Sequence, residues 1–127
     1  MEKVLIIIDE DKMRELYVKF FACAGCIVRQ ASDLLNGLSL LMEEKMDLVL
    51  LDIKMPGLDG YQVCSYIRKD LANKDVKVLA ISGILDEEGA KKIMKLGADD
   101  YLAKPFDNQT LKIKIEGLLE ANKAKSA

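Results

Sequence analysis

The stretch KVLIIIDEDKMRELYVKFFACAG, residues 3–25, decides the fold class because it contains a strand, a loop and a helix in direct succession. Its first part, Val4–Ile8, is an unbroken aliphatic run, which is typical of a strand covered on both faces in a parallel sheet. Three acids, Asp9–Asp11, follow, and apolar side chains then recur at helical spacing up to Gly25. Glycine commonly ends helices, so the stretch predicts a strand, an acidic loop and a helix that stops before Gly25.

The same succession of an apolar run and a helical pattern recurs four more times along the chain. The further strands are expected over residues 26–30, 47–52, 76–81 and 101–103. The further helices are expected after Ser32 as N-cap, over 61–71, over 90–96 and after Asp107. Strands that alternate with helices across short connections predict an α/β fold, with a doubly wound, five-stranded parallel sheet and helices on both faces. We expect residues 1–121 to form a single domain and residues 122–127 a short frayed tail.

The composition describes a globular protein of 127 residues, in which half of the residues are apolar and the net charge is −2. The lysines are dispersed and the pI is near 5.2, so we expect no direct nucleic-acid partner. No apolar run is long enough to span a membrane, and the first residues show no signal-peptide pattern, so we expect a cytoplasmic protein. The sequence contains no histidine, which excludes histidine-activated nucleophiles and imidazole metal ligands.

Two of the three cysteines, Cys23 and Cys26, have the CxxC spacing, and Cys64 is the third. A tetrahedral zinc site needs more ligands than these supply. A redox-active pair belongs at a helix N-terminus, where the dipole lowers a thiol pKa, whereas this motif falls at a predicted helix end. We therefore expect all three to be small buried side chains in a reducing compartment.

Polar residues follow four of the predicted strands: Asp9, Asp52, Ser82 and Lys104. In doubly wound sheets the ligand site lies at the carboxyl ends of the strands, so we expect these side chains to converge. Two close carboxylates repel each other unless a cation lies between them, and oxygen ligands of this kind suit Mg²⁺. A hydroxyl and an ammonium would complete a site for a tetrahedral anion. The set therefore predicts binding of a phosphoryl group.

Three segments resemble the response-regulator receiver domain of two-component signalling, in its chemotaxis-type, stand-alone form. They are residues 52–60, 80–83 and 97–106, which read DIKMPGLDG, AISG and GADDYLAKPF. The spacing from Asp52 to the hydroxyl and to the lysine also matches this family, and the resemblance covers nearly the whole chain. It implies a flavodoxin-like (βα)5 fold with strand order 2-1-3-4-5.

The resemblance implies a role for individual residues. Asp52 is similar to the phosphoacceptor of the family, and Lys104 to its phosphate-binding lysine. Ser82 is similar to the switch hydroxyl and Tyr101 to the switch aromatic residue. Pro105 would follow a cis peptide bond. Apart from its own phosphorylation and slow dephosphorylation, such a protein is not an enzyme.

The resemblance also implies partners and an output. A histidine kinase or histidine phosphotransfer protein, or a small phosphodonor, would phosphorylate Asp52. The surface formed by the fourth helix, fifth strand and fifth helix would then change shape and bind a downstream protein effector. The protein would be a monomer or a phosphorylation-dependent dimer. A branched Ile84, two residues after the switch hydroxyl, would hinder the attacking water and give a long-lived phosphoryl state.

The metal ligands implied by the resemblance are the carboxylates of Asp9 and Asp52 and the backbone carbonyl of Lys54. In the matching register, Ile8 stands where the family has a first acid, so we expect Mg²⁺ to bind more weakly. Glu10 is a candidate to substitute in part. A register shifted by one residue, with Asp9 and Glu10 as the acidic pair, would remove this difference.

Several of these residues also have purely structural explanations. Asp11 is better explained as the N-cap of the following helix than as a ligand. Ser82 would serve as a cap and Tyr101 as a core residue. Asp99 and Asp100 are expected to be loop or turn carboxylates.

Two alternative functions remain open. Ile8 favours a degenerate, non-phosphorylated receiver that acts as a protein-docking module, although the retained Asp52, Ser82 and Lys104 count against it. The strand followed by Asp9-Glu-Asp11 also resembles the first motif of a haloacid-dehalogenase-like phosphatase that would use Asp9. That second resemblance breaks further along the chain, because Asp52 and its Pro-Gly loop would have no role.

Overall fold

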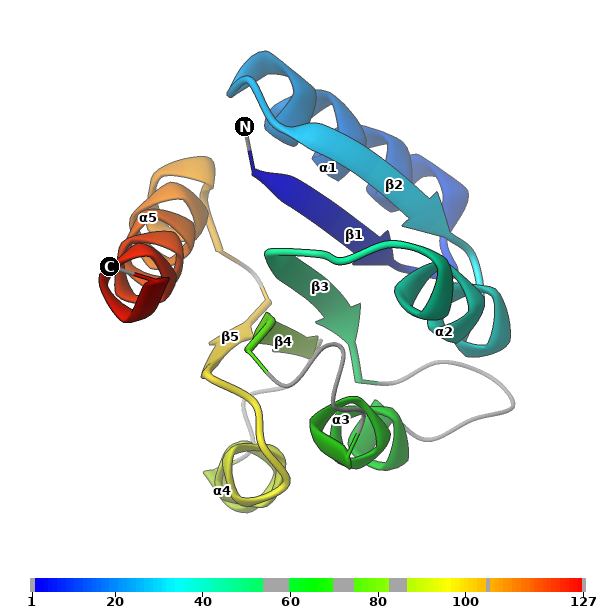
Figure 1. The fold of residues 1–127 in the computed structure, drawn as a ribbon, viewed down its shortest axis with the longest axis vertical. Coiled ribbons are helices and arrows are strands. Elements are labelled where there is room, and N and C mark those ends of the chain that lie inside the picture. The colour runs from blue at the N-terminus through cyan, green and yellow to red at the C-terminus, as the bar shows by residue number, and fades with distance from the viewer. Residues whose placement is uncertain (1, 54–59, 70–74, 83–86, 105, 127) are drawn as a thin grey trace.

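The computed structural model describes residues 2–53, 60–69, 75–82, 87–104 and 106–126. In this part of the chain, five parallel strands form one sheet with the order β2-β1-β3-β4-β5 (Figure 1). The strands are β1 (Lys3–Ile7), β2 (Ile27–Ala31), β3 (Leu48–Asp52), β4 (Lys77–Ser82) and β5 (Asp100–Ala103). The helices are α1 (Asp11–Cys23), α2 (Leu34–Glu43), α3 (Gly60–Lys69), α4 (Glu87–Lys95) and α5 (Asn108–Ser126). The predicted fold class and strand order are confirmed.

Helices cover both faces of the sheet, and each face has its own hydrophobic core. Leu5 and Ile7 of β1 pack on the side of α2, α3 and α4, whereas Val4 and Ile6 pack on the side of α1 and α5. This division follows from the alternation of side chains along a strand. Figure 1 shows α2, α3 and α4 on one side of the sheet and α5 on the other. No described helix combines the length and the hydrophobicity that a membrane-spanning segment requires.

Polar caps begin two of the helices. α2 begins after Asp33, whose Oδ1 accepts a 2.7 Å hydrogen bond from the backbone N–H of Asn36. The prediction of Ser32 as this cap is wrong by one residue, because both side chains are of the capping type and the sequence does not rank them. Asp107 is confirmed at the start of α5, where Oδ1 accepts a 2.7 Å hydrogen bond from the N–H of Thr110. This bond lowers the pKa of Asp107.

Glycines with left-handed backbone follow α1 and α4. The φ angle is 88° at Gly25 and 116° at Gly97, a region that L side chains rarely adopt. The turn after α1 is closed by a 3.1 Å hydrogen bond from the N–H of Cys26 to the carbonyl of Phe21. Both helix ends lie where the sequence predicts them.

Two expectations about the chain differ from the structure. Helix α5 extends to Ser126, so it continues through residues that the sequence assigned to a frayed tail. Lysine and alanine, which are strong helix formers, are frequent there. Cys64 is buried as predicted, but Cys26 is half-buried and Cys23 is exposed. Cys23 follows the buried Phe21 by two residues, which turns it to the opposite side of the helix.

A polar network joins α3 to the start of β4 and the loop after α4. Arg68 donates a 2.7 Å hydrogen bond to the carbonyl of Gly97 and further bonds to the carbonyl of Val76 and the carboxylate of Asp99. The Asp99 carboxylate also accepts a 2.8 Å bond from the N–H of Val78. Asp99 therefore lies in a loop, as predicted, but it is a structural partner of Arg68 rather than a solvated carboxylate.

Candidate functional site

Strand pairing brings the predicted strand-end residues to one edge of the sheet. Asp52 is the last residue of β3 and pairs with Ile81, so that Ser82 comes next along β4. Ser82 pairs with Ala103 of β5, and Lys104 follows directly. Because all strands are parallel, their carboxyl ends meet at the same edge. The backbone therefore places the acceptor, hydroxyl and lysine positions of the sequence prediction side by side.

Asp52 and Lys104 form an ion pair at this edge. Nζ of Lys104 donates a hydrogen bond to Oδ2 of Asp52 over 3.3 Å. Asp52 is 6% exposed, while the Lys104 side chain is 23% exposed. A carboxylate so far removed from water needs a cation or hydrogen-bond donors nearby, and Lys104 supplies the cation. The contact joins residues 52 positions apart in the sequence.

The three acids after β1 occupy different places. Asp9 and Glu10 are exposed, and Glu10 is the N-cap residue of α1 but makes no side-chain capping bond. Asp11 is the first residue of α1, and its Oδ1 lies 2.6 Å from Nη2 of Arg14. The prediction of Asp11 as the N-cap is therefore wrong. Its carboxylate is engaged one helical turn along by Arg14 instead of bonding to backbone N–H groups.

Arg14 ties the end of β1 to β2. Its Nη1 donates a 2.9 Å hydrogen bond to the carbonyl of Ile8 and a 3.5 Å bond to the carbonyl of Asp9. Its Nε donates a 3.0 Å bond to Oε1 of Gln30. The Arg14 side chain is only 14% exposed. The guanidinium thus fixes the backbone that carries Asp9.

Ile8 is fully buried in the apolar cluster on the α1 and α5 side of the sheet, together with Ile6 and Ile81. A hydrophobic core residue therefore stands where the resembling family has its first acid. Among the described residues, no three Asp, Glu or Cys side chains lie close enough to hold a metal ion together. Asp9 and Asp52 remain as two carboxylates at the strand ends, which is the number that Mg²⁺ sites commonly take from a protein.

The other predicted site residues are described to different extents. For Ser82, the structure describes the backbone position at the end of β4. Lys54, Ile84 and Pro105, with its predicted cis bond, lie outside the described residues. Tyr101 lies in β5 and is half-buried against the core cluster on the side of α2, α3 and α4.

Asp100 connects β5 with α5. The sequence places it in a loop or turn, but it is the first residue of β5. Its Oδ2 lies 3.0 Å from Nζ of Lys114 in α5. The prediction of a loop position for Asp100 is therefore wrong. Aspartate is rare in strands, but the ion pair with Lys114 makes this carboxylate favourable at the start of β5.

Tyr17, one of the apolar positions at helical spacing in α1, contacts the segment that follows Lys104. Its ring stacks on Phe106, with the ring centroids 6.2 Å apart and an interplanar angle of 19°. Burial raises the pKa of Tyr17, and the negative charge of Asp52 raises it further. Helical spacing could not reveal this, because the contact to Phe106 joins distant parts of the chain.

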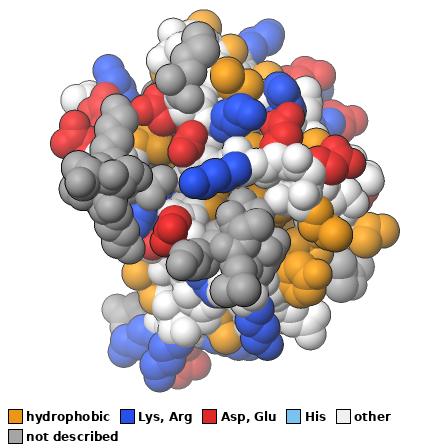
Figure 2. All heavy atoms as spheres, in the orientation of Figure 1, with side chains coloured by type: hydrophobic (Ala, Val, Ile, Leu, Met, Phe, Trp, Pro, Cys, Tyr) orange, Lys and Arg blue, Asp and Glu red, His pale blue; other side chains and the backbone are white. Residues whose placement is uncertain are grey.

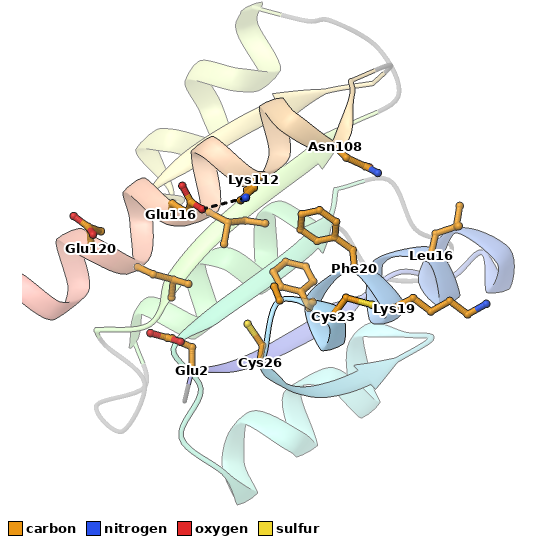
Figure 3. A pocket seen from close by; sticks show the side chains of 14 residues that line it. Glu2, Leu16, Lys19, Phe20, Cys23, Cys26, Asn108, Lys112, Glu116 and Glu120 are labelled. Carbon is orange, nitrogen blue, oxygen red and sulfur yellow. Dashed lines mark ion pairs between the residues drawn. The ribbon is translucent and has the colours of Figure 1, made fainter.

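A cavity of about 790 Å³ lies between α1 and α5 (Figure 3). None of Asp9, Asp52 and Lys104 lines it, so it is separate from the strand-end site. Cys23 and Cys26 both contribute to its wall. In Figure 3 the Cys26 side chain lies on the Glu2 side of the cavity and the Cys23 side chain on the Lys19 side. Cys23 and Cys26 therefore do not belong to the candidate site at the strand ends.

The chain matches the family model of the response regulator receiver domain over residues 4–116. The chain belongs to this family. The probable transcriptional regulator ycf27 of Guillardia theta is 41% identical over 124 residues, which are 97% of this chain and 48% of that protein. The transcriptional regulatory protein CusR of Escherichia coli is 37% identical over 122 residues, which are 96% of this chain and 53% of that protein. The crystal structure of a putative response regulator from Chloroflexus aurantiacus is similar with a TM-score of 0.88 and 29% identity, over 94% of this chain and 98% of that one.

Membership of the receiver family carries several consequences. Receivers act in two-component signal transduction with a histidine kinase as partner, typically use Mg²⁺, and are not enzymes beyond their own phosphorylation chemistry. The family match therefore replaces the phosphatase alternative. The chain spans about half the length of the curated relatives it matches, and those relatives are named transcriptional regulators.

Proposed function

We propose that this receiver accepts a phosphoryl group on Asp52. The observation that supports the proposal is the 3.3 Å ion pair between Asp52 and Lys104, at the edge where β3, β4 and β5 end. The carboxylate offers a nucleophilic oxygen, and the ammonium offers a positive charge for one of the incoming phosphoryl oxygens. The Lys104 side chain is 23% exposed, which is consistent with access by a phosphodonor.

In the proposed transfer, an oxygen of Asp52 attacks the phosphorus of a phosphohistidine on a histidine kinase or histidine phosphotransfer protein. A P–O bond forms as the P–N bond breaks, and the imidazole leaves with the electron pair. With acetyl phosphate as donor, a P–O bond breaks instead and acetate leaves. The product is an acyl phosphate that carries up to about two negative charges next to Lys104.

The two carboxylates at the strand ends fit a Mg²⁺ site in which water and phosphate oxygens complete the coordination. We propose Asp9, Asp52 and the backbone carbonyl of Lys54 as the protein ligands, with Glu10 as a further candidate. When bound, the ion would offset the repulsion between the carboxylate and the phosphoryl oxygens. Because Ile8 provides no carboxylate, we expect a lower Mg²⁺ affinity than in receivers with two acids after the first strand.

Phosphorylation is proposed to change the surface of α4, β5 and α5 through Ser82 and Tyr101. The half-buried place of Tyr101 supports this, because a side chain at the margin of a core has both an inward and an outward position available. In Figure 2 basic side chains gather at the lower edge, where Figure 1 places α4. The exposed lysines of that helix are Lys91, Lys92 and Lys95. A downstream protein is the proposed partner of this surface, with no direct nucleic-acid contact by this domain.

The organisation of the whole protein is a separate proposal. The matched chain of similar length from Chloroflexus aurantiacus supports a stand-alone receiver, whereas the relatives of twice the length support a receiver joined to a further region. The size of the protein in an extract of its own cells distinguishes the two. Three free cysteines fit the reducing conditions of the cytoplasm, which is the proposed compartment. Sedimentation before and after phosphorylation distinguishes a monomer from a phosphorylation-dependent dimer.

The test is intact-mass spectrometry after incubation with acetyl phosphate and Mg²⁺. We expect the wild-type protein to gain the mass of one phosphoryl group, and Asp52→Asn to gain none. Asp100→Asn is the matched control, because Asp100 is also paired with a lysine, at 3.0 Å, but lies away from the acceptor position. Equal labelling of Asp52→Asn and the wild type would contradict the assignment of Asp52.

The buried Ile8 favours one alternative, a receiver that docks a protein without phosphorylation. The same experiment decides between the two readings when beryllofluoride, a mimic of the phosphoryl group, is added in a second arm. A wild-type protein that neither gains mass nor binds beryllofluoride would favour the docking module. Mass gain that depends on Asp52 would exclude it.

A further inference from the structure

The residue that follows Lys104 by two positions is held from the side by helix α1. Phe106 lies in the short segment between β5, which ends at Ala103, and α5, which begins at Asn108. Its ring stacks on Tyr17 of α1, with 6.2 Å between the ring centroids. The stack is therefore a contact between α1 and the segment that carries Lys104.

Three contacts hold the described residues around Lys104 and Phe106. Before Lys104, Ala103 pairs with Ser82 in the sheet. After Phe106, Asp107 accepts the 2.7 Å hydrogen bond that caps α5. Between these two points, the described contact that reaches across to α1 is the stack of Tyr17 on Phe106. Lys104 directly follows the paired Ala103, and Phe106 directly precedes the capping residue Asp107, so the stack is the lateral contact to α1 on this side of the site.

We propose that Tyr17, through its stack on Phe106, is a positioning residue that holds Lys104 beside Asp52. The near-parallel rings, at 19°, have the geometry in which aromatic side chains attract each other beyond their buried area. Both rings are half-buried and pack on the core cluster that contains Leu102 and Leu111, so neither is free to leave the contact without losing apolar packing.

Two further observations distinguish Tyr17 from the neighbouring aromatic residue of α1. The negative charge of Asp52 adds to the effect of burial in raising the pKa of Tyr17. By contrast, Phe20 on the next turn of α1 packs edge-on against Phe21, at 5.5 Å between centroids, and lines the cavity between α1 and α5. The two aromatic residues share a helix, but the ring contact of Tyr17 is with Phe106 and that of Phe20 is with Phe21.

The role needs the ring of Tyr17 and not its hydroxyl. Tyr17→Phe keeps a ring that stacks on Phe106, whereas Tyr17→Leu keeps an apolar side chain but removes the stack. The pair of variants therefore separates bracing from burial. If Tyr17 and Phe106 served only to fill apolar space, Leu at either position would leave Lys104 unaffected, since the change in side-chain volume is modest.

The direct test measures how accessible Nζ of Lys104 is. Each protein is treated with a limiting amount of an acetylating N-hydroxysuccinimide ester, and peptide mass spectrometry gives the labelling of Lys104 relative to the exposed Lys19. We expect Tyr17→Leu and Phe106→Leu each to raise this ratio about three to ten times, and the double variant to raise it no further. Tyr17→Phe should stay at the wild-type ratio. Phe20→Leu is the matched control and should also leave the ratio unchanged.

An unchanged ratio in Tyr17→Leu, or an equal rise in Phe20→Leu, would overturn the proposal. Tyr17→Ala serves as a second variant, and circular dichroism with a urea titration identifies any variant that has lost its fold. This measurement does not depend on phosphorylation. A second readout does rest on the proposed function: the rate of phosphorylation by acetyl phosphate should fall in Tyr17→Leu and recover in Tyr17→Phe. If the wild-type protein is not phosphorylated at all, the proposed function is contradicted. The labelling of Lys104 would still test the positioning role of Tyr17.

Discussion

The guanidinium of Arg14 lies 2.9 Å from the carbonyl oxygen of Ile8, at the point where β1 ends and the acidic residues begin. The same side chain reaches the carbonyl of Asp9 and the side chain of Gln30 in β2. Arg14 therefore holds the backbone of the proposed metal ligand Asp9 against the neighbouring strand. Groups that orient a metal ligand without touching the metal commonly change the metal affinity by about 10- to 100-fold when they are mutated.

We predict that Arg14→Lys weakens Mg²⁺ binding about tenfold. Lysine keeps the positive charge, so the change isolates the loss of the planar fork that bonds to two carbonyls and to Gln30. Calorimetric titration with Mg²⁺ measures the effect. Arg29→Lys is the matched control, because Arg29 makes a 3.0 Å surface bond to Glu44 and is adjacent to Gln30 in the sequence. Equal Mg²⁺ affinities for the two variants would contradict the role of Arg14.

Ile8→Asp tests the consequence of the missing acid. The Ile8 side chain is 0% exposed, so we expect the variant without metal to lose about 2–4 kcal/mol of the free energy of unfolding. We also expect Mg²⁺ to restore part of this loss, because a third carboxylate next to those of Asp9 and Asp52 is favourable only when a cation offsets their repulsion. Urea unfolding with and without Mg²⁺ gives both quantities.

Ile8→Asn is the control for this prediction. It loses the same apolar packing but adds no charge, so Mg²⁺ should stabilise it no more than it stabilises the wild type. The idea fails if Mg²⁺ stabilises Ile8→Asp and Ile8→Asn equally.

The fold was predictable because its strongest signals are local. β3 is buried along its whole length, which gives the unbroken apolar run that marks a strand covered on both faces. Gly25 and Gly97 mark helix ends because their backbone conformation excludes most other residues. The N-cap of α2 was not predictable in the same way, because Ser32 and Asp33 are both residue types that cap helices. Only the hydrogen bond from the backbone of Asn36 to Asp33 identifies the actual cap.

The candidate site was predictable only where topology decides it. Parallel strands end at one edge, so the contact between Asp52 and Lys104 follows from the order of elements. The contacts of Arg68 with Asp99 and of Tyr17 with Phe106 depend on side-chain directions in distant segments. No periodicity carries that information. Asp99 therefore read as an ordinary loop acid, and Tyr17 as an ordinary core position.

Gly97 gives a prediction about crowding. A Cβ atom at Gly97 would overlap with the Cγ of Arg68, whereas a Cβ at Gly25 would meet nothing within 4 Å. Both glycines have positive φ, so both alanine variants are strained in the backbone. We expect Gly97→Ala to lower the free energy of unfolding by about 2–4 kcal/mol and Gly25→Ala by about 1 kcal/mol. Urea titrations measure both.

A double variant separates the two causes at Gly97. In an Arg68→Ala background the overlapping side chain is gone, so Gly97→Ala should cost only what Gly25→Ala costs. If the cost of Gly97→Ala stays the same in that background, the crowding explanation is wrong and backbone strain accounts for the whole effect.

Cys64 gives a prediction about pH. Its thiol is fully buried, and this burial raises its pKa from 9.0 to about 11; the cation of Arg68 acts in the opposite direction, and Asp99 adds to the rise. Below pH 9.0 the thiol is protonated in both the folded and the unfolded chain, so its contribution to stability is complete. Between pH 9.0 and about 11 the unfolded thiol ionises while the folded thiol does not, which favours unfolding.

We therefore predict that the free energy of unfolding of the wild type falls between pH 9.0 and 11 by about 2–3 kcal/mol more than that of Cys64→Ala. Other groups titrate in the same range, so the difference between the two proteins is the quantity to measure, by urea unfolding at each pH. Cys23→Ala is the control, because it removes an exposed thiol and keeps the buried Cys64. If the free energy of unfolding falls equally with pH in the wild type and in Cys64→Ala, the buried Cys64 thiol does not contribute to the pH dependence and the prediction is wrong.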